Sequence, residues 1–206
     1  MPLQSVLPTD EQTEPITPTE LDSLKKQPSE SWSGRRDRVV MDTMFLAGLR
    51  SNEITGLKRS NLHVDDNAID VTPAKFDSER RLSLDEHLVD QLDAFVEDSP
   101  DSKFVFPDAE GGKLSTRYMR SFVNEYSSEA GLSPERFHPH LFRHTYASML
   151  LEVSENLKIV QRALGHDSIQ TTLLYIHPLS GESLEYLELS DRMTLSRFVE
   201  DLPPAE

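Results

Sequence analysis

Apolar residues recur at helical spacing along most of this chain. In residues 35–49, RRDRVVMDTMFLAGL, they form one stripe that predicts a helix with a buried side: Val39, Val40, Met44, Phe45 and Leu49. Residues 51–57, SNEITGL, predict a second, short helix with Ser51 as its N-cap. The helical pattern returns at Asp85 and continues, interrupted by the loop segments FVFPDAEGG and GLSPERFHP.

Between these helical stretches the period of the pattern changes to two. NAIDVTP, residues 67–73, and RRLSLD, residues 80–85, alternate apolar and polar side chains on either side of AKFDSE. Alternation of this kind is typical of strands, so the region predicts two strands joined by a turn. The expected fold class is therefore mainly α, with a small antiparallel β-sheet near the N-terminal third of the chain.

The two ends of the chain differ from this body. The first residues are polar and proline-rich and lack the basic and apolar regions of a signal peptide, so we expect a flexible leader. Thr17, Pro18 and Glu20 then have the spacing of a capping box, which predicts that a helix begins there. The last residues carry apolar side chains at roughly helical spacing after Gly181. The predicted division is leader, body and C-terminal helix: residues 1–16, 17–180 and 181–206.

Length and composition favour a soluble, cytoplasmic protein. At 206 residues the chain is as long as one ordinary domain with short extensions. No apolar run approaches the roughly 20 residues of a membrane span. The chain has no cysteine, which excludes disulfides and thiolate metal ligands.

The charge bears on the choice of partner. A net charge of -15 argues against nucleic acid, because a basic surface is the usual footprint of a nucleic-acid-binding domain. Much of that charge sits at the ends, however. Residues 1–34 hold six acids and two bases, and residues 176–206 hold seven acids and two bases. The middle of the chain is thus much closer to neutral.

The same composition suggests adaptation to a high-salt cytoplasm, as in haloarchaea. Acidic residues are abundant, cysteine is absent, and the chain has 14 arginines but 7 lysines. At molar salt the Debye length shrinks to ~3 Å, so the overall charge repels DNA little and local contacts decide.

Histidines and an arginine crowd the start of one predicted helix, HPHLFRHTYASML, residues 138–150. His140 and His144 are four apart and would suit zinc. Arg143 lies between them, however, and the glutamate of the His-Glu-x-x-His metal motif is absent. A phosphate site uses all of these side chains, since a guanidinium matches phosphate oxygens and a histidine donates a hydrogen bond or carries a proton.

Three further segments carry compatible chemistry. In AGLRSNEITGL, Arg50 follows a Gly-Leu step between two predicted helices, where an arginine could simply complement a helix dipole. Lys75 lies in the predicted turn between the strands and could protonate a leaving oxygen. In LGHDSIQTTLLYIHP, Tyr175 follows His166 by nine residues. A tyrosine becomes a good nucleophile when cationic neighbours favour its phenolate.

In order and spacing, the four segments resemble the C-terminal catalytic domain of the tyrosine recombinase (phage integrase) family. The resemblance covers roughly residues 15–178. It implies the fold of that domain, and it implies six catalytic residues: Arg50, Lys75, His140, Arg143, His166 and Tyr175.

The resemblance also assigns roles to these residues. Tyr175 would attack a DNA phosphate, while Arg50, Arg143 and His140 stabilise the phosphorane-like transition state. Lys75 would protonate the departing 5′-oxygen, and His166 would assist the phosphate or the tyrosine. The reaction that this implies is site-specific recombination of double-stranded DNA through a 3′-phosphotyrosine intermediate, with no metal, ATP or other cofactor.

Some features leave alternatives open. Lys75 stands in AKF, where the family usually has glycine, and only the leader stands where most relatives have an N-terminal clamping domain. The chain could thus be a catalytic domain, a minimal recombinase or a non-catalytic DNA-binding remnant. A nicking and resealing activity like that of type IB topoisomerases is a further alternative. In the family the segment after the nucleophile often docks on a neighbouring protomer in a synaptic tetramer, so residues 181–206 could pack on another protomer or on their own domain.

Overall fold

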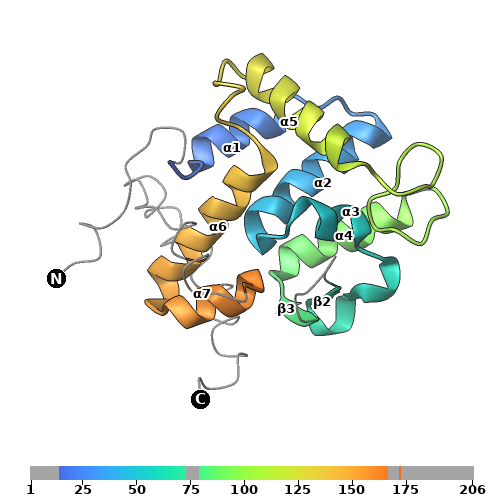
Figure 1. Cartoon of the computed structure of the whole chain (residues 1–206). Helices are drawn as coiled ribbons and strands as arrows, with labels where there is room; N and C mark the ends of the chain where they lie inside the picture. Colours follow the sequence, from blue (N-terminus) through green and yellow to red (C-terminus); the bar gives the residue numbers. More distant parts are fainter. Residues whose placement is uncertain (1–13, 73–78, 167–171, 173–206) are drawn as a thin grey trace.

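The computed structural model describes residues 14–72, 79–166 and 172. Helices dominate these residues, and a small sheet lies at one edge of the helical body (Figure 1). The helices are α1 Pro18–Lys25, α2 Trp32–Ala47, α3 Ser51–Gly56, α4 Glu86–Glu97, α5 Thr116–Glu129, α6 Pro139–Ser154 and α7 Leu157–Leu164. The strands are β1 Leu62–His63, β2 Ala68–Val71 and β3 Arg80–Ser83, with the short 3-10 helices η3 Arg59–Asn61 and η4 Val64–Asp66 around β1.

The sheet is antiparallel, with the order β1-β2-β3. The two predicted strands are β2 and β3, which pair from Ala68 opposite Ser83 to Val71 opposite Arg80. Strand β1 was not predicted, because two residues are too few to show an alternation. Lys75 lies in residues 73–78, outside the described residues.

Helix α1 begins as predicted. The Thr17 side chain accepts a hydrogen bond from the backbone N–H of Glu20, and the Glu20 carboxylate accepts one from the backbone N–H of Thr17. Helix α2 begins earlier than its apolar stripe indicated, because the hydroxyl of Ser31 caps it by accepting from the N–H of Gly34.

The predicted cap of α3 is wrong by one residue. Ser51 is the first helical residue, and Arg50 is the N-cap. Glu53 sets this start, because its carboxylate accepts a hydrogen bond of 2.8 Å from the backbone N–H of Arg50. Arg50 is thereby placed at the elbow between α2 and α3, which Gly48 opens with a left-handed φ of 58°.

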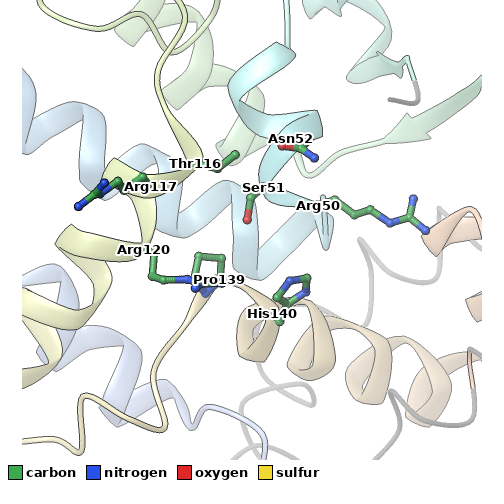
Figure 2. A pocket seen from close by; sticks show the side chains of 8 residues that line it. All are labelled: Arg50, Ser51, Asn52, Thr116, Arg117, Arg120, Pro139 and His140. Atoms are coloured by element: carbon green, nitrogen blue, oxygen red, sulfur yellow. The ribbon is translucent and has the colours of Figure 1, made fainter. Parts of the chain in front are cut away.

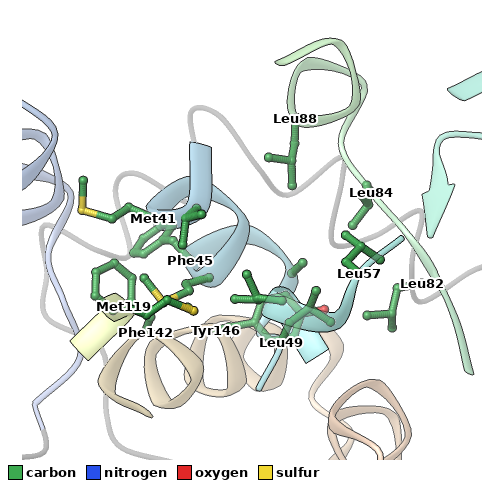
Figure 3. Close-up of a cluster of buried hydrophobic side chains, with 14 of the residues drawn as sticks. Met41, Phe45, Leu49, Leu57, Leu82, Leu84, Leu88, Met119, Phe142 and Tyr146 are labelled. Atoms are coloured by element: carbon green, nitrogen blue, oxygen red, sulfur yellow. The ribbon is translucent and has the colours of Figure 1, made fainter. Parts of the chain in front are cut away.

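The core lies where α2 packs on α6, and both helices are largely buried. Figure 3 shows the contact: Met41 and Phe45 on α2 face Phe142 and Tyr146 on α6. Four of the five stripe residues predicted for α2 and its end are buried, and Val39 is half-buried. Burial of each such side chain contributes roughly 1.5–3 kcal/mol, so this interface fixes α6, which carries His140 and Arg143, against the helix that leads into Arg50.

The packed body includes the last residue of the expected leader. Ile16 is buried, and its backbone N–H donates to the Thr145 hydroxyl of α6 at 2.8 Å. The guanidinium of Arg136 also binds the carbonyls of Glu14 and Pro15. Residues 181–206 lie outside the described residues, and none of the described helices is long and apolar enough to cross a membrane.

Candidate active site

A polar cleft of ≈ 420 Å³ opens where the starts of α3, α5 and α6 meet. Figure 2 shows its lining residues: Arg50, Ser51, Asn52, Thr116, Arg117, Arg120, Pro139 and His140. Arg117 and Arg120 on α5 and His140 on α6 are exposed. The described residues of this lining include three arginines and no carboxylate, so the cleft favours an anion.

Helix α6 supplies two of the predicted site residues. His138 is its N-cap, where the ring Nδ1 accepts from the backbone N–H of Leu141 at 3.2 Å, and Pro139 occupies the first turn. His140 follows at the cleft. The residue as a whole is exposed, but partial burial of its ring, together with the positive charges of Arg143, Arg120 and Arg50, lowers the pKa of His140 below its ordinary value. The ring is therefore mainly neutral at pH 7 and can donate a hydrogen bond.

Arg143 lies one turn further along α6, and its side chain is almost completely buried. Its Nη1 donates to the carbonyl of Gly48 at 2.7 Å, and its Nη2 donates to the carbonyl of Leu164 at 2.6 Å. The guanidinium thus joins the end of α2 to the end of α7, which fixes its position in the core.

His166 follows the left-handed Gly165 that ends α7. Its Nε2 lies 3.0 Å from Nη2 of Arg143, and its Nδ1 lies 3.1 Å from the Thr172 hydroxyl. Burial, then the charges of Arg143 and Arg50, lower the pKa of His166 to about 3, so the ring is neutral at pH 7. Because a guanidinium only donates, Nε2 accepts from Arg143 and Nδ1 carries the proton towards Thr172.

The C-terminal end of α7 gathers three arginines from three separate elements. Each binds one of three consecutive carbonyls: Arg80 that of Ala163 (3.0 Å), Arg143 that of Leu164 (2.6 Å) and Arg50 that of Gly165 (3.3 Å). Carbonyls in the last turn of a helix have no partner within the helix and carry its negative dipole end. The end of α7 is therefore a natural anchor for guanidinium groups.

Glu53 lies buried beneath the same arginines. Arg80 binds it with two parallel hydrogen bonds of 2.9 Å each, and Arg50 donates to it at 3.2 Å. Nη1 of Arg143 lies 3.9 Å from the same carboxylate. Burial acts to raise the pKa of Glu53, but the Arg80 hydrogen bonds and charge outweigh it and the net shift is downward. One ionised carboxylate thus faces three guanidinium groups, and the cluster stays cationic.

The structure brings four of the six predicted site residues into one region. Arg50, His140, Arg143 and His166 come from the α2–α3 elbow, α6 and the end of α7. Tyr175, like Lys75, lies outside the described residues. Among the described residues, no three His, Asp or Glu side chains form a group able to hold a metal ion.

Sequence reasoning missed several residues of this region. Glu53 and Arg80 form its buried support, and Arg117 and Arg120 line the cleft. A weak signal existed for the last two, because they are three apart and share a face of α5. For Glu53 the sequence offered only its spacing of three residues from Arg50. For Arg80 it offered no indication beyond a position in a predicted strand.

Residues 14–182 match the Phage integrase family. The chain belongs to this family of tyrosine recombinases. It is similar to tyrosine recombinase XerD of Lacticaseibacillus casei, with 32% identity over 177 residues that cover 82% of this chain and 59% of the relative. It is also similar to tyrosine recombinase XerC of Xanthomonas campestris pv. campestris (strain B100), with 33% identity over 156 residues that cover 75% of this chain and 48% of the relative. This tyrosine recombinase chain thus spans about half the length of these relatives.

Solved structures confirm the predicted fold class. The XerH site-specific recombinase bound to difH substrate, in a pre-cleavage complex, has a TM-score of 0.69 and 26% identity to this chain. That match covers 89% of this tyrosine recombinase chain and 53% of XerH. XerA recombinase, at 21% identity, shares the fold with a TM-score of 0.71 over 97% of this chain and 67% of its own.

Proposed function

We propose that this chain is the catalytic part of a site-specific recombinase, which cleaves and rejoins double-stranded DNA in the cytoplasm. One observation carries the proposal: Arg50 and Arg143, which are far apart in the sequence, meet at the end of α7 beside an anion-favouring cleft. Relatives named as tyrosine recombinases, and the DNA-bound XerH structure, support the same conclusion.

In the proposed reaction Tyr175 gives its phenolic proton to solvent, because cationic neighbours favour the phenolate, and the phenolate oxygen attacks the scissile phosphate. A bond forms between phosphorus and the phenolic oxygen, and the bond from phosphorus to the 5′-oxygen breaks. Arg50 and Arg143 stabilise the negative charge that grows on the non-bridging oxygens, and the neutral His140 donates a hydrogen bond to one of them. Lys75 supplies the proton to the departing 5′-oxygen. The phosphotyrosine conserves the bond energy, so a 5′-hydroxyl can reverse the step without metal or ATP.

In this proposal His166 has a narrower role than the resemblance alone implies. A neutral ring that accepts from Arg143 at 3.0 Å orients that guanidinium. Arg117 and Arg120 extend the cationic surface along α5 and bind DNA phosphates next to the scissile one. Such phosphate contacts offset the negative charge of the whole chain locally.

The assembly and the setting remain proposals as well. Residues 17–180 form the catalytic domain, and residues 181–206 dock on a neighbouring protomer when two DNA sites are paired in a synaptic tetramer. The abundance of acids and the low number of lysines support a high-salt cytoplasm as the working environment.

A suicide DNA substrate, which traps the covalent intermediate, tests the proposed function. The wild type should form a protein–DNA adduct, and Tyr175→Phe should form none while it still binds DNA. Tyr186→Phe, the same change eleven residues away, is the matched control and should react normally. Arg143→Ala should cleave at least ~10²-fold more slowly, the usual effect of removing one donor from a transition-state site.

The alternatives predict different outcomes of the same assay. A wild type that binds the substrate and forms no adduct is a DNA-binding remnant. An adduct accompanied by relaxation of supercoiled DNA that lacks paired sites indicates nicking and resealing like that of type IB topoisomerases. An adduct that persists in Tyr175→Phe would remove Tyr175 from its role.

A further inference from the structure

The contact between Arg80 and Glu53 is the most fully paired charge contact beside the site. Both side chains are nearly inaccessible, with 9% of Arg80 and 2% of Glu53 exposed. Their two hydrogen bonds of 2.9 Å form a parallel fork, the strongest arrangement between a guanidinium and a carboxylate. None of the roles described so far requires Arg80.

Arg80 also contacts the backbone that holds the site together. Its Nε donates to the carbonyl of Ala163 at 3.0 Å, at the end of α7. A Cβ atom added to Gly165 would lie 2.9 Å from Nη1 of Arg80, so the chain after α7 packs directly on this guanidinium. Since Arg80 begins β3, it fixes the sheet to the helix end that also binds Arg50 and Arg143.

The distances indicate a competition for the Glu53 carboxylate. Arg80 occupies both oxygens closely, whereas Arg50 donates to one at 3.2 Å and Arg143 stays 3.9 Å from the other. Without Arg80, Glu53 would keep the hydrogen bonds from the backbone and side chain of Arg50, and a buried carboxylate that has lost its main cationic partner is costly. If Arg80 were absent, Glu53 would therefore attract the other two guanidinium groups more strongly and draw them away from a bound phosphate.

We propose that Arg80 is a positioning residue for DNA cleavage. Its fork saturates Glu53 and holds the end of α7, so that Arg50 and Arg143 keep their charge directed at the scissile phosphate. The inference rests on the proposed function, because it concerns the rate of the same cleavage step. In this role Arg80 acts through Arg50 and Arg143, and it is not among the residues that line the cleft.

The test compares Arg80→Met with Arg80→Lys, which keeps the charge and loses the fork. Arg81→Met is the matched control, because the side chain of Arg81, next to Arg80 in the sequence, is 49% exposed and forms its ion pair among the described residues with the exposed Asp66. Single-turnover adduct formation gives the rate, and titration with the same DNA gives the affinity. Arg80→Met should slow cleavage about 10²-fold, as expected for misplaced catalytic groups, with little change in affinity. Arg80→Lys should also be slow, and Arg81→Met should react like the wild type.

The compensating variant separates positioning from a merely structural role. Replacing Glu53 by Gln in the Arg80→Met background removes the carboxylate that would capture the other arginines. The cleavage rate of the double variant should be at least about tenfold higher than that of Arg80→Met. Such non-additive effects of two substitutions are found for residues in one hydrogen-bond network and not for independent sites. No recovery, or a wild-type rate in Arg80→Met, would overturn the proposal. Should Arg80→Met not fold, a wild-type rate in Arg80→Lys overturns it equally. If the wild type itself forms no adduct, the proposed function is wrong, and this result is distinct from a failure of the Arg80 proposal.

Discussion

Mild acid should destabilise this protein through His166. The ring is buried beside Arg143, and the positive charges of Arg50 and Arg80 also face it, while the carboxylate of Glu53 opposes them only partly. Its folded-state pKa of about 3 is far below the ordinary value of 6.5. Between these two values the unfolded chain binds a proton that the folded chain rejects. The associated stability is therefore present above pH 6.5 and is lost as the pH falls.

The magnitude follows from proton linkage. Each pH unit below 6.5 favours the unfolded state by about 1.4 kcal/mol until the folded-state pKa is reached. Lowering the pH from 7.5 to 5.5 should thus remove about 1.4 kcal/mol of the free energy of unfolding through His166 alone. That is about a tenth to a quarter of the 5–15 kcal/mol typical of a domain, enough to measure.

Urea unfolding at pH 7.5 and 5.5, at one fixed salt concentration, measures the effect. Other groups titrate in this range too, so the informative quantity is the difference between wild type and His166→Gln. The glutamine can still accept from Arg143 and has no proton to take up. The variant should lose about 1.4 kcal/mol less than the wild type on acidification. His87→Gln, which makes the same replacement at an exposed histidine of α4, is the control for the removal of a histidine as such. Equal losses in His166→Gln and wild type would refute the assignment of a buried, neutral His166.

Three further predictions concern the elbow, the charge and the C-terminus. Gly48→Ala should cost several kcal/mol in urea unfolding, because φ is 58° and the added Cβ would overlap the Tyr146 ring. Gly131→Ala, with φ of 72° and nothing near its Cβ, should cost only the backbone strain of about 1–2 kcal/mol; equal costs would exclude the overlap. When the salt concentration is lowered from molar to ~0.1 M, where the Debye length reaches ~10 Å, circular dichroism should show unfolding, because the 36 acids repel one another. Equal stability at the two salt concentrations would exclude adaptation to salt. Deletion of residues 181–206 should leave single-site cleavage measurable and abolish paired-site recombination; full recombination by the truncated chain would contradict the docking proposal.

Features that depend on near neighbours along the chain could be predicted from the sequence. The capping box at Thr17 needs only Glu20, and the strands β2 and β3 show in their alternation. Arg143 and His166 could be proposed as site residues because they stand at the spacing found in the family, and the structure brings both to the end of α7. The sequence equally supports Tyr175, which stays a prediction.

Contacts between distant residues were decided only by the tertiary structure. Glu53 and Arg80 are 27 positions apart, and the contact of Arg143 with Gly48 spans 95 positions. No periodicity or capping rule links such residues, because their proximity follows from the packing of α2 on α6 and from the contact of Arg80 on β3 with the end of α7. The cap of α3 at Arg50 is instead a local feature, because the Glu53 carboxylate that accepts from its N–H is three residues away, and the tertiary structure adds the contact of that carboxylate with Arg80. The sequence therefore determined which side chains are predicted to carry the chemistry, and the three-dimensional packing determined which buried charges surround those that the structure describes.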